Sequence, residues 1–164
     1  MFLLLRARAL GLPQAEVPIL WALTSLVAAL LSTPLSALSD RLGRTRLIVS
    51  GWMVYAVFYL ILGTQTDNTW ALWPMFAGYG VFLAATEGAE KALVADFVPR
   101  ELAGTAYGWY NLVVGLFLLP ASIVFGWLWQ LETPQIAFGF GAGCALLAAL
   151  LLKFWVEPAR ATTR

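Results

Sequence analysis

Glu87, Glu90 and Lys91 are charged residues inside a long, otherwise apolar stretch of the sequence. In a helix they follow the i, i+3 and i+4 spacing, so we expect them on one face. Charged groups in such surroundings are costly unless they pair or serve a function. Two interpretations stay open: a structural pair of Glu87 with Lys91, with Arg41 or Arg44 as further partners, or a carboxylate that carries a proton or contacts a solute in a cavity.

Other chemistry has few candidate residues. The sequence contains no His and a single Cys, Cys144, which lies in an apolar run and is expected to be a small buried side chain. We therefore predict no catalytic residue, no metal site and no cofactor. The net charge of +1 indicates no nucleic-acid partner.

A second charged group separates two apolar stretches and is called the basic turn here. It consists of Asp40, Arg41, Gly43, Arg44 and Arg46. Gly43 permits a tight turn, and Asp40 could accept hydrogen bonds from backbone N–H groups at a neighbouring helix start. The arginines can pair with acids at adjacent helix ends. We predict a loop over residues 39–46.

The elements that position these residues are apolar and long. Apolar residues make up 61% of the chain and charged residues 12%, and the mean hydropathy is +0.80. Soluble domains have about 45–50% apolar and about 25% charged residues. A membrane helix needs about 20 apolar residues. The predicted spans cover residues 17–38, 47–62, 70–92, 104–129 and 136–155. Residues 1–5 are a further apolar stub, interpreted as the last turns of a helix.

Spans in lipid must be helices or strands of a closed barrel, because lipid cannot satisfy free backbone groups. The run at residues 145–152 is apolar throughout and lacks the alternation of a barrel strand. We predict an all-α polytopic membrane protein with one transmembrane domain over residues 1–164, whose surroundings are a lipid bilayer.

Basic residues gather in alternate connectors. They are Arg41, Arg44 and Arg46 in the first, Lys91 and Arg100 around the second, and Lys153, Arg160 and Arg164 in the tail. The connectors 63–69 and 130–134 contain no basic residue, and their charged residues are Asp67 and Glu132. The positive-inside rule therefore predicts a cytoplasmic basic turn and C-terminus. Arg6 and Arg8 run against the rule, so either a helix end buried by protein holds them or the chain extends further back.

The basic turn resembles the signature loop of the major facilitator superfamily, G-x-L-a-D-R-x-G-R-[RK]. The matching residues are Leu38, Asp40, Arg41, Gly43 and Arg44. Ser36 and Thr45 depart from the pattern. Such departures are more typical of the second copy of this motif, between helices 8 and 9. Residues 99–108 resemble the P-x-x-x-R-G-x-x-x-G entry of helix 11. Ala103 replaces the usual Arg there, and Arg100 could substitute.

This resemblance implies the C-terminal half of a twelve-helix fold, from the end of helix 7 to helix 12. It implies a fragment of a secondary active transporter that moves a small solute, a drug or a metabolite, by alternating access, with protons as a candidate coupling ion. The basic turn would be a cytoplasmic gate, with Asp96 and Arg100 as candidate partners. A missing N-terminal half or a second chain would be required. The implied location is the bacterial inner membrane, the plasma membrane of such cells.

Two smaller expectations concern helix shape. Pro120 is a candidate kink in the middle of its span. The pairs Gly104 with Gly108 and Gly139 with Gly143 are expected to allow close helix packing.

Three alternatives to a transporter fragment stay open. The chain could be a membrane scaffold or assembly protein without transport. It could be a half-transporter that pairs with a separate N-terminal half. An intramembrane enzyme is the third, with few residues to support it.

Overall fold

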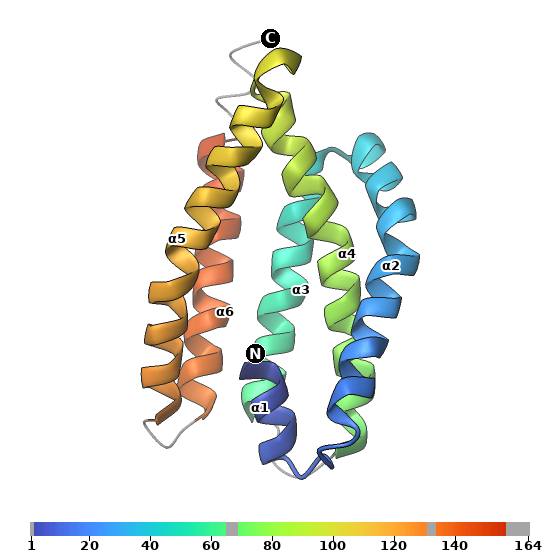
Figure 1. Cartoon of the computed structure of the whole chain (residues 1–164), viewed down its shortest axis with the longest axis vertical. Helices are drawn as coiled ribbons and strands as arrows, with labels where there is room; N and C mark the ends of the chain where they lie inside the picture. Colours follow the sequence, from blue (N-terminus) through green and yellow to red (C-terminus); the bar gives the residue numbers. More distant parts are fainter. Residues whose placement is uncertain (1, 65–68, 131–133, 157–164) are drawn as a thin grey trace.

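The computed structural model describes residues 2–64, 69–130 and 134–156 and is helical over almost all of them (Figure 1). Its helices are α1 (Phe2–Ala9), α2 (Val17–Leu42), α3 (Arg44–Thr64), α4 (Leu72–Asp96), α5 (Ala103–Gln130) and α6 (Pro134–Leu151), with short turns η1 (Thr69–Ala71), η2 (Arg100–Leu102) and η3 (Leu152–Val156). These ranges contain no strand, which confirms the all-α fold class. Asp67, Glu132, Arg160 and Arg164 lie outside the described residues.

Within the described residues, four helices are long and apolar enough to cross a membrane. They are α2, α3, α5 with the preceding η2, and α6 with most of η3. α4 has 25 residues but is not among them, and Glu87, Glu90, Lys91 and Asp96 lie in its second half. The predicted five ranges therefore all contain a helix, but one of the five is too polar to face lipid on every side.

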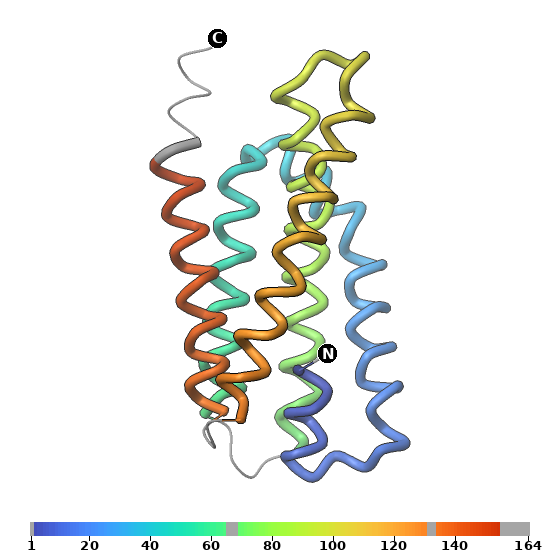
Figure 2. Tube along the Cα trace, turned by 60° about the vertical axis from the view of Figure 1, so that its left-hand side comes forward, coloured from blue at the N-terminus to red at the C-terminus, as the bar shows by residue number. Residues whose placement is uncertain are grey.

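The two most extensive helix contacts, α2 with α4 and α3 with α6, join helices that are not consecutive in the sequence. α4 lies between α2 and α3, α3 also packs along α6, and α5 leans against α6 and the upper part of α4 (Figures 1 and 2). Glycines allow the closest approaches. A Cβ added at Gly80 would lie 2.6 Å from the carbonyl oxygen of Thr24, and one added at Gly51 would lie 2.5 Å from Cγ2 of Thr86.

The glycine pairs singled out in the sequence are not at these contacts. A Cβ at Gly104, Gly108, Gly139 or Gly143 would meet nothing within 4 Å. The expectation of close packing there is wrong within the described chain. Gly104 and Gly108 lie on α5, which contains no buried residue. Gly139 and Gly143 lie on α6, whose buried residues are others, such as Ala137, Phe138 and Ala142. Pro120 lies inside α5, which stays helical on both sides of it.

α1 carries both basic residues that run against the predicted orientation. Arg6 is only 7% exposed, and its Nε and Nη2 donate to the carbonyl oxygens of Leu62 and Gly63 at 3.2 and 3.3 Å. These carbonyls end α3 and have no partner within their own helix. Of the two explanations left open, burial of the helix end by protein holds for Arg6, whereas Arg8 is exposed.

Candidate functional site

The basic turn is more compact than predicted, because Gly43 alone separates α2 from α3. Asp40 and Arg41 belong to the last turn of α2, and Arg44 and Arg46 to the first turn of α3, so the predicted loop over residues 39–46 is wrong. The φ of Gly43 is 93°, which only glycine adopts readily and which ends one helix and starts the next directly. Its N–H donates to the carbonyl oxygen of Ser39 at 3.0 Å.

Arg44 connects the start of α3 with the end of α4. Its Nη1 lies 2.5 Å from Oδ1 of Asp96 and also donates to the carbonyl oxygen of Ala92. Its Nη2 lies 3.8 Å from Oδ1 of Asp40. The guanidinium therefore holds both a carboxylate and a backbone carbonyl near the end of α4. The structure brings together Arg44, Asp40 and the candidate partner Asp96.

The other basic candidates lie apart from this contact. Arg41, Arg46 and Arg100 are exposed. Within the described part of the chain, none of the three forms an ion pair. Arg100 begins η2, just after Pro99. Arg44 is thus the residue of the basic turn that joins two helices through its side chain.

Glu87 and Lys91 form the expected pair in the second half of α4. Their side chains are 69% and 52% exposed, and Nζ of Lys91 lies 3.1 Å from Oε1 of Glu87. Both line a hollow of about 330 Å³ between α2 and α4, together with small residues such as Ser32 and Gly88. We call this the polar hollow. Glu87 pairs here with Lys91 and not with the arginines of the basic turn.

Glu90 does not join that pair, which corrects the prediction of a single charged face. Its Oε1 accepts from Nε1 of Trp52 at 3.2 Å, and its Oε2 accepts from the hydroxyl of Tyr110 at 2.8 Å. A helix turns by about 100° per residue, so Glu90 and Lys91 point in different directions. Glu90 therefore connects α4 to α3 and α5. Trp52 and Tyr110 were not singled out from the sequence, because only packing brings them to Glu90.

The fold and these contacts define an all-α, multi-pass membrane protein whose charged contacts lie at one end of the bundle and beside one hollow. The sequence pattern of the Major Facilitator Superfamily matches residues 1–164. The chain belongs to this superfamily, which confirms the resemblance of the basic turn and of residues 99–108.

Three curated proteins are similar to this chain. An uncharacterized MFS-type transporter of Methanocaldococcus jannaschii is 35% identical over 139 residues, which cover 84% of this chain and 34% of that protein. The class B tetracycline resistance protein of Escherichia coli is 24% identical over 88% of this chain and 35% of its own length. Glycerophosphoinositol transporter 1 of Saccharomyces cerevisiae is 31% identical over 52% of this chain and 17% of its own. No solved structure matches.

Proposed function

We propose that this chain forms the C-terminal half of a secondary active transporter, which moves a small organic solute by alternating access. The chain spans about a third of the length of its first two relatives, 34% and 35%. In this proposal α2 to α6 all cross the membrane of a bacterial-type cell. The end that carries Gly43 and the C-terminus lie in the cytoplasm, as the basic residues favour.

The ion pair of Glu87 and Lys91 is the observation that carries this proposal. Both side chains are more than half exposed in the isolated chain. Charged groups at this depth do not face hydrocarbon but turn to a water-filled cavity or to another protein surface. The polar hollow therefore faces a cavity that a second half completes. By contrast, the exposed side chains of α6, such as Leu147 and Leu150, are apolar and suit lipid.

The contact of Arg44 with Asp96 supplies a candidate gate. It holds α3 against α4 at the same end as the single-residue junction at Gly43. A junction without a loop couples the movement of α2 to that of α3, so a movement of α3 relative to α4 strains or releases the ion pair. We propose that this pair is closed in one transport state and broken in the other.

We propose that the solute is a drug or a small metabolite. The two relatives with specific names concern different compounds, tetracycline and glycerophosphoinositol. Protons are the proposed coupling ion, with Glu87 as their carrier, because its carboxylate borders the polar hollow. Glu87→Gln keeps the size of the side chain and removes its charge, so proton-coupled movement should be lost.

Accessibility of the polar hollow from the two sides of the membrane tests alternating access. A chimera in which this chain replaces the matching third of the M. jannaschii relative supplies the remaining helices. In a Cys144→Ala background, Ser32→Cys should react with an impermeant, charged thiol reagent added to either side of sealed vesicles. The matched control, Leu147→Cys, is 57% exposed on an apolar face and should react from neither side.

The scaffold alternative predicts a different result. A membrane scaffold covers the same ion pair with a fixed partner surface and has no reason to open to both sides. Reaction of Ser32→Cys from a single side, or from neither, would therefore contradict alternating access and favour the scaffold.

A further inference from the structure

The polar hollow combines one positive and one negative charge with small walls. Among the described residues that line it, Glu87 and Lys91 are the charged ones, so the lining has no net charge but carries a dipole. Its volume of about 330 Å³ is near the lower end of the range for ligand sites, about 300–1,000 Å³. The hollow therefore suits a small solute.

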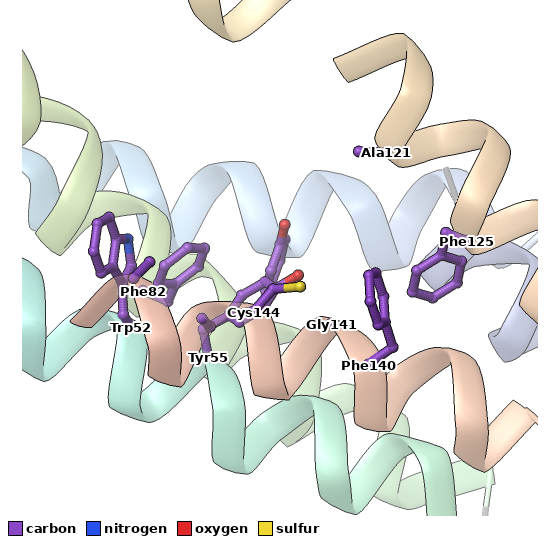
Figure 3. Close-up of a pocket in the computed structure, with 11 residues that line it drawn as sticks. Trp52, Tyr55, Phe82, Ala121, Phe125, Phe140, Gly141 and Cys144 are labelled. Carbon is purple, nitrogen blue, oxygen red and sulfur yellow. The ribbon is translucent and has the colours of Figure 1, made fainter. Parts of the chain in front are cut away.

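The bundle has a second hollow with different chemistry, of about 480 Å³ between α3, α4, α5 and α6 (Figure 3). Aromatic rings of α3 and α4, including Tyr55 and Phe82, form one wall, and Phe125 of α5 stands opposite. Cys144 lines this hollow and is exposed, so the expectation of a buried thiol is wrong. No charged residue of the described chain lines it. Of these two hollows, the polar one is where a charged solute finds opposite charges.

We infer that the polar hollow binds a short zwitterion, in which a single carbon separates a cationic nitrogen from a carboxylate. Because the polar hollow is the proposed solute cavity, this solute class rests on the proposed function. A solute with one charge would bring a net charge into a lining that has none, and an unbalanced charge away from bulk water is costly. A zwitterion brings no net charge and offers each side chain an opposite partner.

The spacing of the ion pair matches such a solute. Nζ of Lys91 lies 3.1 Å from Oε1 of Glu87. In an α-amino acid the nitrogen and the carboxyl carbon are about 2.5 Å apart, from the standard N–Cα and Cα–C bonds. A zwitterion lying antiparallel to the pair thus places its cation beside Glu87 and its carboxylate beside Lys91 at once. The pair need not break, because the ammonium has three donors and the carboxylate two acceptor oxygens.

The walls of the polar hollow favour a compact, aliphatic solute. The hydroxyl of Ser32 donates to the carbonyl oxygen of Ala29 at 3.1 Å, so its oxygen remains an acceptor for a cationic group. Gly88 keeps α2 close to the pair, since a Cβ there would lie 2.8 Å from Oγ of Ser36. The other lining residues are apolar and mostly small: Ala28, Ala29, Leu83 and Ala84.

Lys91 is a native reporter for this site. The chain has two lysines, and Lys153 on η3 is exposed and does not line the hollow. Trimethylglycine is the probe, because it is a short zwitterion without an N–H that an acetylating reagent could consume. At ~50 mM it should slow acetylation of Lys91 about threefold or more, since ligands of this size bind in the millimolar range. Lys153 should react at an unchanged rate.

Timed exposure of the chain in detergent micelles to N-succinimidyl acetate, followed by peptide mass spectrometry, measures both rates. Three analogues at equal concentration and ionic strength separate a zwitterion site from simpler ones. The tert-butylacetate anion has the shape of trimethylglycine without its positive charge, choline lacks the carboxylate, and γ-butyrobetaine holds its charges further apart. Each should protect Lys91 clearly less than trimethylglycine does.

Two pairs of variants test the location. Glu87→Gln should abolish the protection of Lys91, whereas Glu101→Gln, at an exposed acid on η2, should keep it. Ala29→Leu fills the hollow from an exposed position on α2 and should also abolish protection. Ala22→Leu, about two turns earlier on the same helix, is exposed and outside the lining, so it should keep protection.

Equal protection of Lys91 by the tert-butylacetate anion would overturn the inference, because the hollow would then be an anion site. An unchanged acetylation rate with trimethylglycine, or protection that survives Glu87→Gln, would overturn it as well. These outcomes are distinct from a failure of alternating access, which the reactivity of Ser32→Cys from the two sides measures. Protection without access from both sides would retain the zwitterion site and remove transport, and access from both sides without protection would do the reverse.

Discussion

Gly43 joins two helices with a backbone conformation that other residues rarely adopt. Its φ of 93° and ψ of 134° lie in a region that is strained for any residue with a Cβ. We predict that Gly43→Ala lowers the free energy of unfolding by about 1–3 kcal/mol. Thermal unfolding in detergent micelles, followed by circular dichroism, measures this change.

The control for this variant is Gly104→Ala on α5. A Cβ at Gly104 meets no atom within 4 Å, and the backbone φ of Gly104 is not positive. Alanine also favours a helix over glycine, so this substitution should be neutral or slightly stabilising. Equal destabilisation by both substitutions would show that the junction at Gly43 is not strained.

The pairs of Arg44 with Asp96 and of Glu87 with Lys91 should differ in strength. The first pair is 24% and 23% exposed, joins two helices and includes a hydrogen bond to a carbonyl. We expect a double-mutant cycle to give a coupling energy of about 1–2 kcal/mol, between that of a surface pair and that of a charged hydrogen bond. Chemical unfolding in mixed micelles of the wild type, two single variants and the double variant supplies the values.

Glu87 and Lys91 provide the comparison, since both lie on α4 and are more than half exposed. Exposed i, i+4 pairs contribute about 0.5 kcal/mol or less. A coupling energy for Glu87 and Lys91 as large as that for Arg44 and Asp96 would remove the distinction between a structural contact and a pair that is free to act on a solute.

At the level of elements, the contact between α2 and α4 depends on Gly80. A Cβ there would lie 2.6 Å from the carbonyl oxygen of Thr24 and 2.9 Å from Cβ of Val27, so the helices must separate to admit it. We predict that Gly80→Ala destabilises the fold by about 1–3 kcal/mol, as overpacking does. Gly78→Ala, two residues away in open space, should not destabilise it. Melting temperatures of both variants decide between these outcomes.

α5 depends on one side chain for its polar link to the bundle. Among the described residues, the hydroxyl of Tyr110 makes the hydrogen bond that connects α5 to another helix, and α5 buries no residue. Tyr110→Phe should therefore speed hydrogen exchange along the first half of α5, with a loss of about 1–3 kcal/mol. Tyr107→Phe, on the preceding turn, is the control. Unchanged exchange in Tyr110→Phe would mean that apolar contacts alone hold α5.

The sequence predicted those features that depend on local composition. Apolar length located every long helix, and the arginine-rich turn located the junction at one end of the bundle. It did not predict contacts that depend on which helices meet. Glu90 was predicted to share a face with Glu87 and Lys91. It instead accepts hydrogen bonds from Trp52 of α3 and Tyr110 of α5, which are 38 and 20 residues away in the sequence. The close contacts fell at Gly51 and Gly80, because spacing alone does not show which face of a helix has a neighbour.

For the whole molecule, the two hollows need different complements. The polar hollow holds an exposed ion pair, which requires water or a polar surface. The hollow between α3, α4, α5 and α6 has no charged lining residue within the described chain and suits apolar groups. In the proposed function, a second transporter half meets the first need. The two hollows of the described bundle thus differ in chemistry.

Because a solute cavity completed by a second half is part of this proposal, the chain alone should not transport. We predict no solute-driven proton flux in liposomes that contain only this chain, measured with an enclosed pH-sensitive dye. Tetracycline and glycerophosphoinositol are the probe solutes, since two relatives are named for them. The chimera with the M. jannaschii relative should show flux with a solute that it accepts, and its Glu87→Gln variant should lose that flux. Flux through the chain alone would show that one such bundle, or an assembly of its copies, forms a complete pathway.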